Sequence, residues 1–266
     1  MNARAFPHAL KAWRQSRRRS QLDLALAASV SQRHLSFLES GKAAPSRQMV
    51  LQLADALELP LRECNDLLQA AGFAPAYAEP TLDDAQLAPV REALTCMLEH
   101  HAPFPALVVD RDWQLLQIND GVQRLLGACE LTPERLARLG DAQGRLNTLR
   151  LTLHPDGLSP FIENRDQVLA HLVSRSRRDQ ALSLRGHSWQ AIADLVPAGL
   201  AAQHALPHAL LPVLPLVLRI GDTRLSLFTT LTTFGTPLDV TTDELRVESF
   251  YPMDEETRAW FRGAQA

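Results

Sequence analysis

The chain has 266 residues, of which 46% are hydrophobic and 21% are charged. This composition is typical of globular proteins and too apolar for a disordered chain, and the length accommodates a small domain and a larger one. No apolar run reaches the ~20 residues of a membrane span, and the basic N-terminus lacks the apolar core of a secretion signal. We therefore expect a cytoplasmic protein with no membrane association, whose three widely spaced cysteines form neither a disulfide framework nor a zinc site.

Positive charge is concentrated at the start of the chain. The first 47 residues contain nine Lys or Arg against only Asp23 and Glu39, whereas residues 79–266 contain seventeen Lys or Arg against twenty-four Asp or Glu. A basic segment on an acidic body predicts that the segment binds a polyanion. The run from Arg17 to Arg19 is not decisive by itself, because consecutive arginines are also typical of a solvated helix face.

The first 75 residues are expected to form an all-α bundle. Helical periodicity predicts five short helices, at Pro7–Arg19, Gln21–Ala27, Gln32–Glu39, Arg47–Leu57 and Leu61–Ala71. Gly41, Pro60 and Gly72 follow the last three, as expected at helix ends. A proline-containing linker over residues 76–89 separates this domain from a second one at residues 90–266.

The second domain is expected to be α+β. Runs rich in Val, Ile, Leu, Phe and Thr predict strands at Ala106–Val109, Trp113–Ile118, Leu214–Ile220, Thr223–Thr233 and Leu245–Tyr251. The two-residue connection Gly221-Asp222 is suited to a tight hairpin between the third and fourth of these runs. Helices are predicted at Ala85–His101, Asn119–Leu126, Pro133–Leu139, Asn164–Arg178, Ser188–Val196 and Asp254–Arg262.

The segment Gln21–Gly41 carries the most specific pattern of the first domain. A three-residue turn at residues 28–30 joins two helices, and apolar spacing predicts one core containing Leu22, Ala25, Leu26, Val30, Leu35 and Leu38. The segment resembles the Xre-type, lambda-repressor-like helix-turn-helix, whose pattern it carries at Gln21, Ala25, Val30-Ser31 and Glu39-Ser40-Gly41. Ser29 departs from that family, which usually has glycine there in a left-handed conformation, at a cost of about 1 kcal/mol.

A helix-turn-helix predicts sequence-specific binding to a double-stranded DNA operator. The N-terminal end of the recognition helix enters the major groove, so we predict base contacts from Gln32, Arg33, Ser36 and Phe37. Contacts to the DNA backbone are predicted from Gln21, Ser31, Lys42 and Arg47. One short helix reads few base pairs, so we expect a homodimer on two half-sites. The alternatives are that Arg33 is merely solvated, that Phe37 is core, or that the segment is a protein-binding, antitoxin-like module.

The resemblance extends into the second domain. The strings PALVVDRDWQLLQIN, LTLHPDGL and LFTTLTTFGTPLDVTTDELRVESFYPMDEETRAW are similar to Xre-type regulators that carry an MmyB-like ligand-binding domain, and Thr232–Val240 is the most specific piece. This resemblance implies a PAS-like domain, in which a sheet with helices over one face encloses an apolar cavity. It also implies a small apolar, fatty-acid-like ligand.

Several residues of the second domain are candidates for lining such a pocket, although strand residues of this kind more often form plain core. The candidates are Phe104, Trp113, Leu115, Asn119, Arg150, His154, Leu218, Leu227 and Phe234. Arg150 is the first choice for an acidic head group, because a guanidinium binds a carboxylate through two hydrogen bonds. No nucleotide-binding, hydrolase or metalloprotease motif occurs, so we expect no catalytic site, no metal and no cofactor beyond a bound small molecule.

Three functions remain open from the sequence. The protein is a ligand-responsive regulator, a constitutive DNA-binding protein whose second domain only dimerises, or a regulator whose second domain recruits a protein partner. A small molecule that stays bound through purification would favour the first of these.

Overall fold

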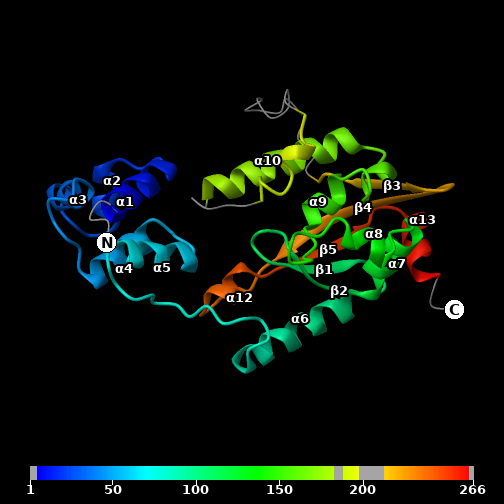
Figure 1. Ribbon diagram of the computed structural model, residues 1–266, viewed down its shortest axis with the longest axis horizontal. Coiled ribbons are helices and arrows are strands. Elements are labelled where there is room, and N and C mark those ends of the chain that lie inside the picture. Colours follow the sequence, from blue (N-terminus) through cyan, green and yellow to red (C-terminus); the bar gives the residue numbers. More distant parts are fainter. Residues whose placement is uncertain (1–4, 183–187, 198–212, 264–266) are drawn as a thin grey trace. The chain divides into compact units, whose positions relative to one another are not determined.

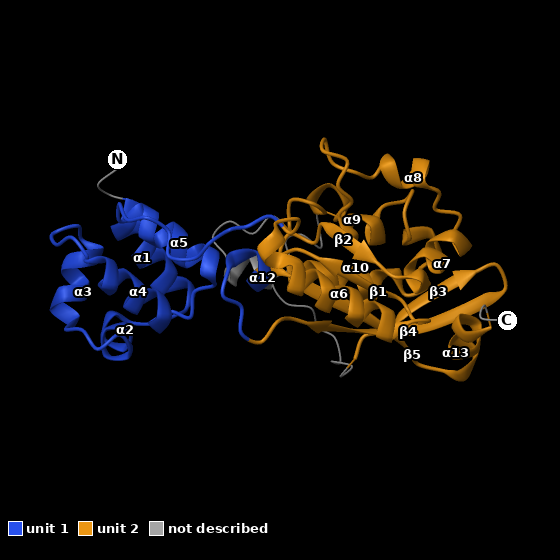
Figure 2. Ribbon diagram, turned by 90° about the horizontal axis from the view of Figure 1, so that it is seen from below, with its two compact units in different colours: residues 1–81, 181–184, 236–243 blue, residues 82–180, 185–235, 244–266 orange. Residues whose placement is uncertain are grey.

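The computed structural model describes residues 5–182, 188–197 and 213–263 of the chain (Figure 1). These residues form two compact units, coloured separately in Figure 2. The first unit contains the residues up to Thr81 and, from much later in the sequence, residues 181–182 and the segment Thr236–Asp243. The second unit contains most of the chain from Leu82 onward. The boundary after Thr81 lies inside the predicted linker.

The N-terminal part of the first unit is a helical bundle. Its helices are α1 (Ala5–Ser16), α2 (Gln21–Ala27), α3 (Gln32–Glu39), α4 (Arg47–Ala56) and α5 (Leu61–Ala70). The bounds of α2 and α3 agree with the prediction to the residue. Helix α1 ends earlier than predicted, because Arg18 adopts a left-handed φ of 52° that a right-handed helix cannot include.

Serine side chains cap the N-terminal ends of three of these helices. Ser20 forms a capping box with Asp23 at the start of α2. Ser31 Oγ accepts the His34 N–H at the start of α3, and Ser46 Oγ accepts the Met49 N–H at the start of α4, both at 3.2 Å. These local caps explain why the three helices begin at the predicted residues.

Two leucines predicted to lie in the core are on the surface. Leu24 and Ala25 of α2 are buried with Leu35 of α3, whereas Leu22 and Leu26 are 49% and 70% exposed. The buried face of α2 is therefore rotated by one residue position from the face that the spacing predicted. The core prediction is wrong for these two residues.

The arginines that follow α1 cap the C-terminal end of α4. Arg17 Nε donates to the Leu57 carbonyl at 3.0 Å, and Arg19 Nη1 donates to the Ala56 carbonyl at 2.7 Å. Carbonyl groups at the C-terminal end of a helix lack helical partners, and positive charge suits that end of the helix dipole. Arg17 and Arg19 therefore have a structural role, which the sequence did not indicate.

The first part of the predicted linker is packed against α5. The buried Asn65 accepts the N–H groups of Ala76 and Tyr77 at 2.9 and 3.0 Å, and its Nδ2 donates to the Tyr77 carbonyl at 2.8 Å. Arg62 and Glu79 add an ion pair at 2.8 Å. This stretch of chain is held by α5 rather than free.

The second unit is α+β, as predicted, and is built on an antiparallel sheet. Its strands have the order β2-β1-β5-β4-β3. They are β1 (Ala106–Val109), β2 (Leu115–Ile118), β3 (Leu216–Ile220), β4 (Thr223–Thr232) and β5 (Arg246–Pro252). The predicted hairpin joins Ile220 to Thr223, and Gly221 has the positive φ of 57° that such a tight turn favours.

Helices cover both faces of this sheet, whereas the resemblance implied one covered face (Figure 1). Side chains alternate along β1, so Leu107 and Val109 join one hydrophobic cluster and Ala106 and Val108 join another. The second cluster contains side chains of α6 (Ala88–His101), which follows the 3-10 turn Ala85–Leu87. The first cluster contains side chains of α7 (Asp120–Ala128), α9 (Thr148–Leu153), α10 (Arg165–Leu182) and α13 (Glu255–Arg262), and the partly buried Leu136 of α8 (Pro133–Ala137) packs against it.

Three short elements differ from the prediction. The predicted helix at Ser188–Val196 contains only a 3-10 turn, Ala193–Leu195, and another 3-10 turn lies at Ser159–Phe161. Helix α12 (Val240–Glu244) was not predicted, and neither was α9. These pieces are too short for a periodic pattern to stand out, because one or two helical turns contain few repeats.

Candidate nucleic-acid interface and ligand cavity

The turn between α2 and α3 has the predicted helix-turn-helix form. Residues 28–30 connect α2 to the cap Ser31, and the Val30 N–H donates to the Ala25 carbonyl at 2.8 Å. Ser29 has a φ of 52°, so it adopts the left-handed conformation for which the family usually has glycine. Leu35 and Leu38 are buried on the inner face of α3. The opposite face of α3 therefore points outward.

The outward face of α3 brings together basic and aromatic side chains. Gln32 and Arg33 are exposed, and Phe37 is half-buried. Arg33 Cζ lies 5.4 Å from the centroid of the Phe37 ring and Lys42 Nζ lies 6.0 Å from it, close enough for cation–π attraction. Phe37 therefore supports two cations beside the recognition helix and is not plain core.

Three further predicted contact residues differ in exposure. Ser31 and Arg47 are exposed, and Ser36 is half-buried. Ser31 Oγ already accepts the His34 N–H, so its hydroxyl hydrogen is the group that it can offer to a phosphate. Arg47 is the first residue of α4, where the helix dipole also favours an anion. The DNA contacts of these residues stay predictions.

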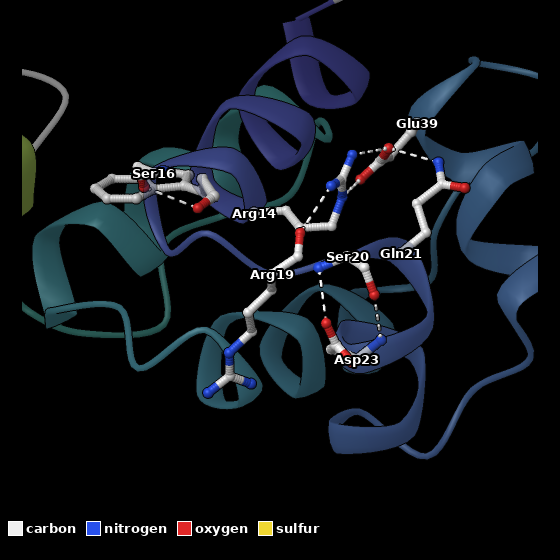
Figure 3. Close-up of polar contacts among 8 residues, drawn as sticks. Arg14, Ser16, Arg19, Ser20, Gln21, Asp23 and Glu39 are labelled. Carbon is white, nitrogen blue, oxygen red and sulfur yellow. Dashed lines mark hydrogen bonds and ion pairs between the residues drawn. The ribbon is translucent and has the colours of Figure 1, made fainter.

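Gln21, predicted to bind a phosphate, belongs to a polar cluster inside the bundle (Figure 3). Arg14 Nε and Nη2 donate to the two carboxylate oxygens of Glu39 at 2.6 and 3.0 Å, and Gln21 Nε2 donates to Glu39 Oε2 at 2.8 Å. The side chains of Arg14 and Glu39 are only 12% and 4% exposed. Burial opposes ionisation of Glu39, but the hydrogen bonds from Arg14 and Gln21 outweigh burial and lower the pKa of Glu39. The cluster joins α1, α2 and the end of α3, so it positions the recognition helix.

The second unit contains a cavity of about 90 Å³ between the sheet and helices α9 and α10. Its apolar walls come from Leu149, Val168, Leu172, Leu214, Leu216 and Phe250. Trp113 also lines it, together with the polar residues Thr148, Thr152, His171, Arg175, Thr229 and Glu248. The cavity is thus apolar on several sides and charged on others.

A glutamate and an arginine share the cavity. Burial raises the pKa of Glu248, while the nearby Arg175 guanidinium and a hydrogen bond with Thr229 act in the other direction. Arg175 Cζ lies 4.0 Å from the centroid of the Trp113 ring. The cavity can therefore offer a ligand a guanidinium, a carboxyl group and an aromatic face.

Trp113, which lines the cavity, has an unusual backbone conformation. Its φ is 66°, which is rare for a bulky residue. Neighbouring groups hold it there: its N–H donates to the Asp110 carbonyl at 3.1 Å, and its carbonyl accepts from Thr148 N and Oγ1 at 2.9 and 3.2 Å. Strained residues of this kind persist where their surroundings over-determine them, often at ligand sites.

Most of the residues predicted to line a pocket lie elsewhere. Only Trp113, of the nine, lines this cavity. Arg150, the predicted head-group ligand, donates through Nη1 to Asp194 at 2.9 Å and to the Ala191 carbonyl at 3.2 Å, so it anchors the Ala193–Leu195 turn instead. His154 Nδ1 accepts the Asp156 N–H at 3.0 Å.

The other predicted pocket residues are structural. Asn119 caps α7 and accepts the Ala106 N–H at 3.0 Å, so its amide is used within the fold. Leu218 and Leu227 are fully buried in the first cluster, against which the partly buried Phe104 and Leu115 pack. Phe234 packs against the second cluster. These placements correct the predicted lining.

The polar lining residues of α10 were missed, although the sequence contained a signal for them. Val168, His171, Leu172 and Arg175 have the i, i+3, i+4, i+7 spacing of one helix face. An arginine and a histidine that share a helix face with apolar residues indicate a polar site at the edge of a core, and His171 is indeed exposed. Glu248 had no such signal, because it alternates normally along β5.

Matches to two known families identify the chain as a ligand-responsive DNA-binding transcription regulator. Residues 10–64 match the helix-turn-helix family, and residues 90–263 match the MmyB-like transcription regulator ligand binding domain. The second match covers more than half of the chain, so the protein belongs to the family of MmyB-like transcription regulators. Both resemblances noted in the sequence are thereby confirmed. No match was found among the curated proteins.

Two features are absent from the described part of the chain. Within residues 5–182, 188–197 and 213–263, no helix has the length and apolar character needed to span a membrane. The same residues contain no group of three or more His, Cys, Asp or Glu that could hold a metal ion.

Proposed function

We propose that the cavity binds a small amphiphilic molecule of the fatty-acid kind and that this binding changes the affinity of the protein for its operator. The observation that carries this proposal is a cavity with several apolar walls and one arginine, Arg175, in a domain that belongs to a ligand-binding family. Arg175 is the natural partner for a carboxylate head group, since a guanidinium can donate two parallel hydrogen bonds. We infer that the domain is PAS-like, because helices and a sheet surround a cavity. We also infer that the protein lies in the cytoplasm, where its DNA partner is.

The size of the cavity bears on how such a ligand would act. A cavity of 150 Å³ holds about one benzene molecule, and drug-sized ligands occupy roughly 300 to 1,000 Å³. At about 90 Å³, this partly open cavity is smaller than an acyl chain, so we infer that binding such a chain requires α10 and the sheet to move apart. A ligand that requires such movement prefers the opened state, and differential preference is the condition for shifting an equilibrium.

Ligand binding should change operator affinity by about 5- to 150-fold, the usual range for coupling between two sites. The test is to titrate octanoic, decanoic and palmitic acid into the full chain by calorimetry and then to measure operator binding with the tightest of them present. Arg175→Met should weaken binding of that acid at least tenfold, because a charge-assisted hydrogen bond is removed. Arg150→Met is the matched control and should leave ligand binding unchanged, since Arg150 lies outside the cavity.

The outcomes separate the ligand-responsive function from the two alternatives left open by the sequence. Saturable binding without a change in operator affinity contradicts the sensor function. If none of the acids binds, the alternative of a constitutive regulator whose second domain only dimerises or recruits a protein is favoured.

We also propose that the protein binds its operator as a homodimer. Two half-sites with centres about 34 Å apart, one helical turn of DNA, would present the same groove to both copies of α3. Sedimentation of the protein alone and on a duplex selected from random sequences should show two chains per operator, and the selected duplex should be palindromic. A strictly monomeric protein in both conditions contradicts this prediction.

A further inference from the structure

The connection between β4 and β5 belongs, by its contacts, to the DNA-binding unit. Strands β4 and β5 are part of the sheet of the second unit, yet Thr236–Asp243 between them clusters with the first unit (Figure 2). We call Thr236–Asp243 the strap.

One contact of the strap is a helix cap for α5. This helix begins after Pro60, which makes no side-chain hydrogen bond to the first turn. Asp243 Oδ2 accepts the Leu61 N–H at 3.1 Å, although the two residues are 182 positions apart in the sequence. The carboxylate also lies at the positive end of the helix dipole. The strap therefore supplies the kind of acceptor that serines supply to α2, α3 and α4.

The strap also binds the linker that follows α5. The Val240 N–H donates to the Ala78 carbonyl at 3.0 Å, and Thr241 Oγ1 donates to the Pro80 carbonyl. Val240 is fully buried. Because the linker is itself bound to α5, the strap, the linker and the start of α5 form one connected structure.

Both strands that carry the strap line the cavity. Thr229 of β4 lies seven residues before Thr236, and Glu248 of β5 lies five residues after Asp243. The two strands are paired here, with Leu231 opposite Glu248 and Thr229 opposite Phe250. A rearrangement of β4 and β5 around a ligand would reach the strap through a few residues of chain.

We propose that the strap transmits occupancy of the cavity to the DNA-binding unit by holding or releasing the start of α5 and its linker. This inference rests on the proposed function, because it takes the cavity as the ligand site. Leu67 and Leu68 of α5 are buried in the core that also contains Leu35 and Leu38 of α3. A displacement of α5 therefore reaches the helix that reads DNA.

The cap is tested by Asp243→Ala in the full chain. Amide hydrogen exchange in the first turn of α5, residues 61–64, should become about fivefold faster, the effect expected when a helix is deprived of its N-cap. Asp254→Ala is the matched control, since Asp254 caps α13 by accepting the Thr257 N–H at 2.8 Å. The control should speed exchange at the start of α13 and leave residues 61–64 unchanged. Unchanged exchange at residues 61–64 in Asp243→Ala overturns the proposal.

Transmission is tested by filling the cavity with a side chain. Thr152 of α9 lines the cavity and lies on neither β4 nor β5. Thr152→Leu should change exchange at least twofold both in the strap and at residues 61–64, and Thr152→Met should do the same if leucine is not accommodated. Thr95→Leu, the same substitution at an exposed site on α6, should have neither effect. In an Asp243→Ala background, Thr152→Leu should alter residues 61–64 at most half as much, because only the contacts of Val240 and Thr241 with the linker remain.

The outcomes distinguish this inference from the proposed function. If the cavity variants change exchange only in β4 and β5 and not at residues 61–64, the strap does not transmit occupancy of the cavity. This conclusion holds whether or not fatty acids change operator binding. If residues 61–64 respond to the cavity variants but no fatty acid binds, transmission through the strap stands and the ligand class is wrong.

Discussion

Glu39→Gln should lower the free energy of unfolding of the N-terminal unit by about 3 kcal/mol, because removing one partner of a buried ion pair leaves the other charge unpaired. Arg14 and Glu39 share two hydrogen bonds in a nearly dry site, and Gln21 adds a third to the same carboxylate. The measurement is urea unfolding followed by amide exchange in α1 and α3. Glu58→Gln is the matched control, because Glu58 is 83% exposed and pairs with Arg19 at 3.4 Å. The control should cost less than about 1 kcal/mol.

The same variant has a defined pH dependence. The pKa of Glu39 is lower in the folded protein than its ordinary value, so its ionisation contributes stability that is present at neutral pH and disappears as the pH falls through the folded pKa. The difference in unfolding free energy between the native protein and Glu39→Gln should therefore narrow below about pH 4, near the ordinary pKa of a glutamate. If the difference in unfolding free energy stays constant from pH 7 to pH 3, ionisation of Glu39 does not stabilise the folded protein.

The parts of the fold that could be predicted are those with local causes. Ser31 begins α3 three residues before the His34 N–H that it accepts, and the hairpin at Gly221 needs only one backbone conformation. Alternation along β1 likewise predicts which residues share a face. Such features depend on sequence neighbours, so they can be read without knowing the rest of the fold.

The parts that could not be predicted depend on residues far apart in the sequence. Arg17 contacts the end of α4 forty residues later, and Asp243 caps a helix 182 residues earlier. The sequence favoured Arg150 as the head-group ligand and offered no reason to choose Arg175. Only the fold shows that Arg150 is paired with Asp194 outside the cavity, whereas Arg175 lines the cavity beside Trp113 and Glu248.

Arg33→Ala should weaken binding to the selected operator by about 5- to 150-fold, since a good bidentate base contact is worth about 1 to 3 kcal/mol of discrimination. The guanidinium is exposed at the start of α3 and lies over the Phe37 ring, which limits the directions it can take. Base preference should relax at one position in each half-site, and Gln32→Ala should have a similar effect at a neighbouring position. The measurement is operator Kd for the selected duplex and for duplexes changed one base pair at a time.

Lys42→Ala separates base reading from simple charge, because Lys42 lies beside the same ring but beyond the end of α3. It should weaken all duplexes by a similar factor and reduce the slope of log Kd against log salt by about one for each phosphate that the lysine neutralises. Arg47→Ala should behave like Lys42→Ala, whereas Arg18→Ala removes the same charge outside α2 and α3 and should leave both the affinity for all duplexes and the base preference nearly unchanged. If Arg33→Ala also weakened every duplex equally, Arg33 would bind a phosphate, and the base-reading residues of α3 would have to be Gln32, Ser36 or Phe37.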